Sequence, residues 1–176
     1  MGVTAGLVHV AGARVAELVA AGLSGTGEYV SGDYALMVDK PSVLETDDGL
    51  LLVDGTGEIT GEDAAIASAL GRQVTSATLG SAATVYRVAV TGPGGVLREI
   101  VDVEGERQVD TGDPLPQEDA TTLLEDETLA LFERLTRVTL RDVIDGSLHV
   151  LRQGEPAPEP DTAMRKKGFF GRFFGA

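Results

Sequence analysis

The stretch that decides the fold spans residues 83–109 and reads as three strands joined by two tight turns: TVYRVAV, TGPGG, VLREIVDV, EG and ERQV. Its strands are rich in β-branched and aromatic residues, which suit a pleated surface. Gly92-Pro93-Gly94-Gly95 cannot continue a strand, and Glu104-Gly105 has the length of a two-residue hairpin loop. Arg87 interrupts the first strand, so we expect one face of this meander to meet water. The other face needs a cover, because an isolated hairpin is marginally stable.

The residues before the meander predict helices and further strands. Residues 7–10 read as a short edge strand or as the lead into a helix. The alanine-rich residues 11–21 predict a helix, and Gly22 stands where a left-handed cap belongs. The other expected elements are a loop over 24–27, strands over 29–30, 34–38 and 49–53, a helix that Thr60 caps and Gly71 ends, and a strand over 74–79.

The residues after the meander predict a covering helix over 119–137, because Leu131, Phe132 and other apolar residues recur at three and four positions. Thr139 and Asp142 have the spacing of a capped helical turn, and residues 148–151 predict a last strand. We therefore predict one α+β domain over residues 1–152, with a mainly antiparallel sheet covered by helices. A Pro-rich acidic linker over 153–163 and a basic-aromatic peptide over 164–176 follow it.

Several motifs follow one another in a distinctive order: GDYALMV at 32–38, ALGR at 69–72, the meander, GDPLP at 112–116 and LALFERLTRVTL at 129–140. This order resembles that of an uncharacterised family of small α+β proteins from high-GC bacteria, which sometimes resembles immunity proteins of toxin systems in size, acidity and fold class. The resemblance covers roughly residues 30–145 and implies a fold class, without transferring a catalytic residue. This chain departs from the family in having Tyr34 in place of an expected tryptophan and in adding the linker and the C-terminal peptide.

Composition excludes several classes of site and partner. The 176 residues contain no cysteine and two histidines, His9 and His149, which excludes disulfides, thiolate metal sites and multi-histidine metal sites. The net charge is −14, and the residues before 164 carry 10 basic against 28 acidic side chains, so we expect no nucleic-acid binding. Neither a secretory signal nor an apolar run of membrane-spanning length is found, and we expect a cytoplasmic protein.

Three groups of residues were weighed as candidate sites, and none predicts a catalytic, cofactor or metal site. The run Asp47, Asp48, Asp54, Glu58, Glu62 and Asp63 lacks the spacing of a calcium loop, so we interpret it as solvated acids. Gly25-Thr26-Gly27 and Gly55-Thr56-Gly57 lack the lysine of a phosphate-binding loop and are interpreted as turns.

His149 is the third candidate, because Glu99, Asp102 or Glu104 could join it as a general acid or base. Nothing in the sequence fixes their geometry, and we expect a hydrogen-bonded structural histidine. An enzyme or small-ligand protein remains the alternative function. It would use a pocket between sheet and helices in which Arg87, His149 and carboxylates gather.

The C-terminal peptide carries the functional hypothesis, because it holds four of the five phenylalanines and four basic residues without an acid. In a helix its phenylalanines would fall within about 140° of arc. We therefore expect a non-catalytic acidic interaction module whose peptide docks on a protein partner or an anionic membrane surface, rather than packing back on its own domain. The oligomeric state stays open. The expected docking residues are Arg165, Lys166, Lys167, Phe169, Phe170, Arg172, Phe173 and Phe174.

Overall fold

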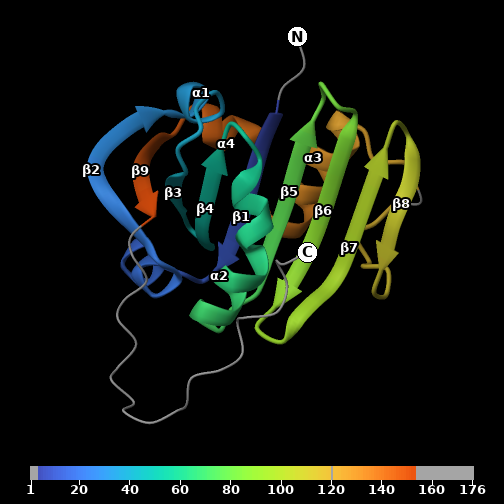
Figure 1. Cartoon of the computed structure of the whole chain (residues 1–176), viewed down its shortest axis with the longest axis horizontal. Helices are drawn as coiled ribbons and strands as arrows, with labels where there is room; N and C mark the ends of the chain where they lie inside the picture. The colour runs from blue at the N-terminus through green and yellow to red at the C-terminus, as the bar shows by residue number, and fades with distance from the viewer. Residues whose placement is uncertain (1–3, 120, 154–176) are drawn as a thin grey trace, which may run out of the picture.

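A computed structural model of the chain describes residues 4–119 and 121–153, which form a nine-stranded sheet with helices on both faces (Figure 1). The strand order is β2-β9-β3-β4-β1-β5-β6-β7-β8, and every neighbouring pair is antiparallel. The strands are β1 (Thr4–Ala11), β2 (Leu23–Ser31), β3 (Ser42–Thr46), β4 (Gly49–Asp54), β5 (Val74–Gly80), β6 (Val85–Gly92), β7 (Gly95–Val103), β8 (Glu106–Thr111) and β9 (Ser147–Gln153).

The helices divide between the two faces of the sheet. In the view of Figure 1, α2 lies in front of the central strands and α3 lies behind them. The face of α2 also carries the 3₁₀ helices η1 and η2, and the face of α3 also carries α1 and α4. Their bounds are η1 (Val15–Ala21), α1 (Gly32–Ala35), η2 (Glu58–Glu62), α2 (Asp63–Leu70), α3 (Glu125–Thr136) and α4 (Leu140–Ile144).

The sheet is buried on both faces at its centre, and two apolar clusters share it. In β4, Leu50 and Leu52 pack toward α2, whereas Leu51 and Val53 pack toward α3. Successive side chains of a strand point to opposite faces, so a strand covered on both sides must be apolar throughout. This confirms the buried strand that residues 49–53 predict.

The central meander is confirmed as β6, β7 and β8, with turns at the two predicted positions. The expected wet face is wrong, because α2 covers the side of β6 that carries Arg87. The guanidinium of Arg87 pairs there with the carboxylate of Asp63, 2.9 Å away, in the first turn of α2. A charged residue in a strand pattern therefore marked an ion pair beneath a helix, not a solvated face.

The N-terminal expectations need three corrections. Residues 7–10 belong to the interior strand β1, which pairs with β4 and β5, and are neither an edge strand nor a helix. The helix expected over 11–21 is the shorter 3₁₀ helix η1, although Gly22 ends it with the predicted left-handed φ of 74°. The loop expected over 24–27 lies within β2, because β9 supplies backbone partners on both sides of a bulge there.

Two further corrections concern residues 32–63. The strand expected over 34–38 is α1 and the turn after it, while β3 was missed. Thr60 does not cap α2: its hydroxyl donates to the Gly57 carbonyl 2.7 Å away within η2, and α2 begins only at Asp63. At residues 34–38, aromatic and apolar residues outweighed the turn signals beside them, and at Thr60 the cap was assigned one turn too early because η2 precedes α2.

The C-terminal half follows the sequence more closely. Helix α3 is shorter than expected, but Leu131 and Phe132 are buried against the sheet as predicted. The predicted cap of α4 is present: the Thr139 hydroxyl accepts from the Asp142 N–H at 3.1 Å. The predicted last strand is β9, which lies inside the sheet between β2 and β3.

Candidate functional site

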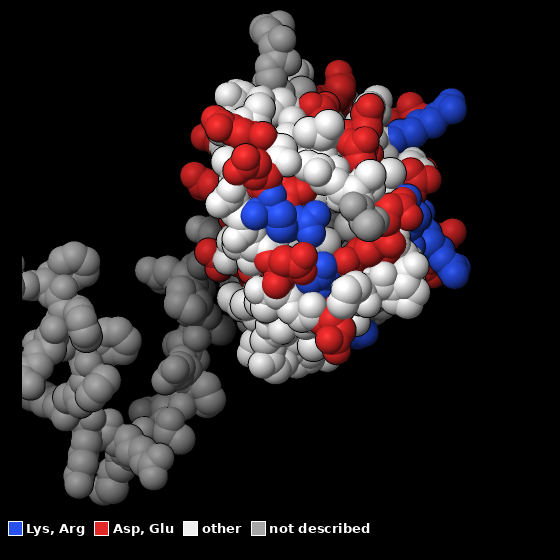
Figure 2. All heavy atoms as spheres, turned by 90° about the vertical axis from the view of Figure 1, so that its right-hand side faces the viewer, with Lys and Arg blue, Asp and Glu red and all other residues white. Residues whose placement is uncertain are grey.

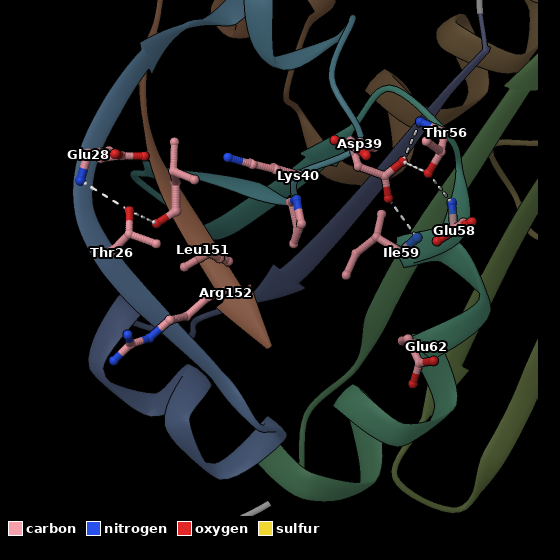
Figure 3. Close-up of a pocket in the computed structure, with 13 residues that line it drawn as sticks. Thr26, Glu28, Asp39, Lys40, Thr56, Glu58, Ile59, Glu62, Leu151 and Arg152 are labelled. Carbon is pink, nitrogen blue, oxygen red and sulfur yellow. Dashed lines mark hydrogen bonds between the residues drawn. The ribbon is translucent and has the colours of Figure 1, made fainter. Parts of the chain in front are cut away.

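A cleft opens just before the start of β3, where the strands on its two sides separate. Strand β3 pairs with β9 only at Ser42 and Val43, so β2 and the end of β9 curve away from the sheet as an arm (Figure 1). Residues 38–41 bridge the gap: the Leu151 N–H donates to the Pro41 carbonyl at 2.8 Å, and the Gly55 N–H donates to the Val38 carbonyl at 2.7 Å. The hollow between the arm and the segment from Asp54 to Glu62 holds about 400 Å³, and we call it the arm cleft (Figure 3).

One wall of the arm cleft is the turn that follows β4. Asp54 is buried, and its carboxylate accepts hydrogen bonds from the Thr56 N–H at 2.8 Å, from the Ile59 N–H at 2.6 Å and from the Gly57 N–H. A carboxylate that accepts several backbone N–H groups locks a turn. Because these amides point at Asp54, Gly55-Thr56-Gly57 is a turn rather than a phosphate cradle, as the sequence predicts.

The opposite wall is held by His149. The Gly27 N–H donates to Nε2 of His149 at 3.1 Å, which places the proton of a neutral ring on Nδ1. The ring of Tyr29 stacks on the imidazole, with centroids 4.8 Å apart and an angle of 9° between the planes. Gly25 is required here, because a Cβ at this position would lie 2.5 Å from Cε1 of His149. The expectation of a hydrogen-bonded structural histidine is confirmed.

The exposed side chains of the arm cleft are mostly acidic. Glu28, Asp39, Glu58 and Glu62 line the hollow, as labelled in Figure 3. The basic residues that line it are Lys40 and Arg152. Within residues 4–119 and 121–153, none of the four carboxylates forms an ion pair. An uneven charge with unpaired carboxylates favours a cationic ligand.

A second hollow adjoins the arm cleft and is aromatic. It holds about 460 Å³ and shares Glu28, Asp39, Lys40 and Val150 with the arm cleft. Tyr29 and Tyr34 line it, and both rings stay more than half exposed. Exposed tyrosines are common anchors at protein interfaces, since each has an apolar body and a polar tip.

The polar clusters elsewhere in the described residues are closed within the fold. The guanidinium of Arg87 contacts Glu99 at 2.7 Å, Asp63 at 2.9 Å and Ser76 Oγ at 2.9 Å. Burial alone would lower the pKa of Arg87, but its hydrogen bonds to Glu99 and the charge of Asp63 raise the pKa instead. Such a network stabilises the packing of α2, and its hydrogen-bonding groups are engaged within the fold rather than with a ligand.

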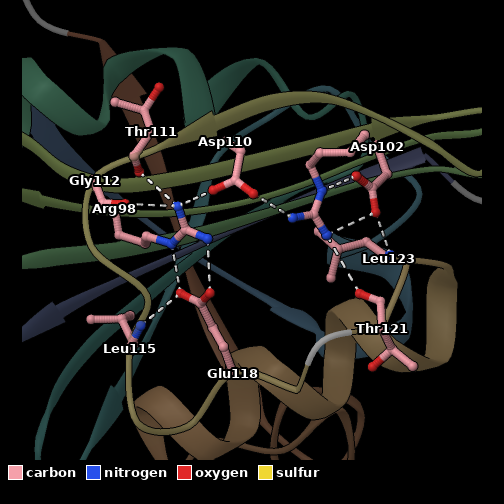
Figure 4. Close-up of polar contacts among 10 residues, drawn as sticks. Arg98, Asp102, Asp110, Thr111, Gly112, Leu115, Glu118, Thr121 and Leu123 are labelled. Atoms are coloured by element: carbon pink, nitrogen blue, oxygen red, sulfur yellow. Dashed lines mark hydrogen bonds and ion pairs between the residues drawn. The ribbon is translucent and has the colours of Figure 1, made fainter.

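The flank formed by β7 and β8 contains a second closed cluster (Figure 4). Arg98 is almost fully buried and makes two parallel bonds to Glu118, at 2.7 and 2.8 Å. These bonds hold the pKa of the Glu118 carboxyl below its usual range. The carboxylate of Asp102 is buried, accepts from the Leu123 N–H and pairs with Arg107. Figure 2 shows the same flank from outside, with its basic side chains surrounded by carboxylates.

The general acid–base group that was the alternative for His149 does not form. His149 lies on β9, whereas Glu99 and Asp102 lie on β7, and β3, β4, β1, β5 and β6 stand between these strands. Arg87 on β6 is also remote from His149. Among residues 4–119 and 121–153, no three His, Asp or Glu side chains gather in a metal-binding arrangement. The docking residues Arg165, Lys166, Lys167, Phe169, Phe170, Arg172, Phe173 and Phe174 lie outside the described residues.

No family model, curated protein or solved structure matches the chain. Within the described part of the chain, no helix has both the length and the apolar character that crossing a bilayer requires. The functional assignment therefore depends on the chemistry of the chain itself.

The sequence pattern missed the surface made by Tyr29, Tyr34, Asp39 and Lys40. Reading residues 34–38 as a strand assigned half of their side chains to a core. The available signals were Gly32-Asp33 before this stretch and Asp39-Lys40-Pro41 after it, which are turn-forming residues on both sides.

Proposed function

We propose that this protein is a non-catalytic interaction module whose C-terminal peptide, residues 164–176, docks on a protein partner or an anionic membrane surface. The observation that carries the proposal is the separation of charge and aromatic residues along the chain. The peptide holds four basic residues, four phenylalanines and no acid, whereas the residues before it carry a formal charge of −18. Aromatic side chains anchor interfaces, and basic ones add a salt-dependent attraction to acidic partners.

The position of β9 supports the proposal. Strand β9 ends at Gln153, and the chain continues from there toward residues 164–176. An acidic body attached through the Pro-rich segment 154–163 can stay cytoplasmic while the peptide engages a membrane or an assembly. Arg87 and His149, which the alternative enzyme would need in one pocket, belong to separate parts of the sheet.

Capture and sedimentation experiments test the proposal. A reporter protein fused to residues 164–176 is compared with one in which Phe169, Phe170, Phe173 and Phe174 are serine. We expect the first to sediment with phosphatidylserine vesicles at low salt, or to retain a defined protein from a native lysate, and the second to do neither. The full-length chain with the same four changes should lose the same target. A fusion that binds neither vesicles nor a protein contradicts the proposal.

A further inference from the structure

The chain carries both an acidic, aromatic surface and a basic, aromatic peptide. Met37, Tyr29 and Tyr34 are 73%, 67% and 52% exposed, and these three large apolar side chains lie within nine residues of one another in sequence. The two tyrosines line the second hollow, beside the arm cleft. A concentration of exposed aromatic side chains beside a hollow is typical of a peptide-binding surface.

The charge of this surface defines the chemistry of its ligand. The carboxylates of Glu28, Asp39, Glu58 and Glu62 line the two hollows without an ion pair among the described residues. By contrast, the buried or half-buried carboxylates beneath α2 and beside β7 are paired with arginine. A ligand with several cations and several aromatic rings complements this surface better than an anion or an uncharged apolar chain.

Residues 164–176 have that chemistry, and the fold attaches them at the edge of the cleft. Arg152 lines the arm cleft, and the chain leaves β9 one residue later, at Gln153. The intervening Pro-rich residues 154–163 span up to about 30 Å when extended, which is ample to reach either hollow. A tether of this length makes binding intramolecular, at an effective concentration on the order of millimolar, so even weak affinity fills the site.

We propose that residues 164–176 bind in the arm cleft and the second hollow of their own chain, in competition with the external target. The phenylalanines pack against Tyr29 and Tyr34, and the basic residues pair with the carboxylates around them. This inference rests on the proposed function, since it supplies the regulation of the same peptide. A target must displace the peptide from the cleft, which raises the threshold for docking.

Disulfide trapping tests the contact, because the natural chain has no cysteine. The full-length chain receives one cysteine at Met37→Cys and one at Gly175→Cys, and is oxidised with diamide at micromolar protein concentration. The matched control has Leu97→Cys in place of Met37→Cys, since Leu97 is 55% exposed on β7, at the other side of the sheet. We expect the intramolecular disulfide to form about tenfold faster at position 37 than at position 97.

Two further variants test whether the charges of the cleft and the phenylalanines of the peptide are responsible for the contact. Changing Glu28, Asp39, Glu58 and Glu62 to their amides should slow trapping at position 37 severalfold, as should changing the four phenylalanines of the peptide to serine. Equal rates at positions 37 and 97 overturn the proposal. A disulfide-linked dimer as the main product at position 37 overturns binding in cis and shows exchange between copies.

This trapping needs no external target, so its failure and that of the proposed function are distinguishable. Preferred trapping at position 37 by a peptide that binds no vesicle or protein would support the cleft and reject the docking function. Vesicle or protein binding by a peptide that traps equally at both positions would do the reverse.

Discussion

The two flanks of the sheet are closed by different chemistry. On the flank of β7 and β8, the Arg98 guanidinium is buried and shared among Glu118, Asp110 and two backbone carbonyls. On the flank of β2 and β9, one N–H to the imidazole of His149 and one stacked tyrosine hold the bulge, while the surrounding carboxylates stay exposed. On the flank of β7 and β8 the charged side chains pair with one another, whereas on the flank of β2 and β9 the carboxylates are available to bind a ligand. The difference places the candidate site on the second flank.

The largest effect is expected between the flanks, at Phe132 of α3, and it sets the scale for the others. Phe132 is 2% exposed, so Phe132→Ala should lower the free energy of unfolding by about 3–5 kcal/mol. Leu124→Ala is the control, because Leu124 is 49% exposed, and it should change stability by less than about 1 kcal/mol. Urea unfolding measures both. Similar values for the two variants would mean that α3 does not cover the sheet.

A smaller loss is expected on the closed flank, from Glu118→Gln. The change breaks the two-bond pair with a buried arginine, so the free energy of unfolding should fall by about 3 kcal/mol at pH 7. The Glu118 pKa is lowered in the folded protein, so its contribution is present above about pH 4.5 and is lost as the pH falls through the folded pKa. The difference between the variant and the natural protein should therefore shrink in acid.

The control for Glu118→Gln is Asp145→Asn, which removes an exposed pair with Arg141 in α4. Exposed pairs contribute at most about 1 kcal/mol, so urea unfolding of this variant should resemble that of the natural protein. Equal losses from the two variants would remove the contrast between a buried charge network and a surface pair.

The dependence of stability on pH between 7 and 5 tests a buried histidine at the centre of the sheet, away from both flanks. His9 is buried in β1 and its Nε2 atom has no hydrogen-bond partner among the described residues. Burial lowers its pKa, and the charge of Asp48 opposes this only in part. The unfolded chain therefore binds the proton first, and stability should fall as the pH drops below about 6.5, by at most about 1.4 kcal/mol per pH unit.

Substitution assigns that titration to one histidine. His9→Gln should flatten the stability profile between pH 7 and pH 5. Urea unfolding of this variant and of the natural protein at several pH values measures the slope. A slope that survives unchanged in His9→Gln would show that this buried histidine does not cause it.

The smallest global effect is expected on the open flank, from His149→Ala. It removes one hydrogen bond and one ring stack from an exposed bulge, so stability should change by about 1 kcal/mol or less. Hydrogen exchange at the Gly27 amide should nevertheless accelerate, because its acceptor is gone. Tyr29→Phe keeps the stack and should leave that amide protected. Unchanged exchange in His149→Ala would show that the imidazole does not hold the arm.

The sequence predicted best what depends on local pattern. Strong alternation and turn residues identified β6 to β8, and the 3.6-residue spacing around Phe132 identified the buried face of α3. The apolar run of β4 likewise indicated burial on both faces. Each of these signals depends on residues that are close together in the sequence, so the local pattern is enough to predict the element.

What the sequence could not predict depends on pairing over long distances. Residues 7–10 have the same pattern at an edge or at the centre, and only their pairing with β4 and β5 makes β1 central. Gly25 and Gly27 resemble a loop until β9 supplies their partners, which are Leu151 for Gly25 and the His149 ring for Gly27. The sequence pattern did not predict the residues that line the candidate site for the same reason. Glu62 lines the arm cleft and Tyr34 lines the second hollow only after the arm has formed.

The interior position of β9 has a consequence for how the chain is assembled during synthesis. Gly27 and its acceptor His149 are 122 residues apart, so β2 has no strand beside it until nearly the whole domain has emerged from the ribosome. At about 5–20 residues per second, that interval lasts roughly 6–24 s. An unpaired strand is an aggregation hazard over such a time, but β2 contains Ser24, Gly25, Gly27 and Glu28 in place of a continuous apolar run. The polar composition that made β2 resemble a loop therefore suits a strand that pairs last.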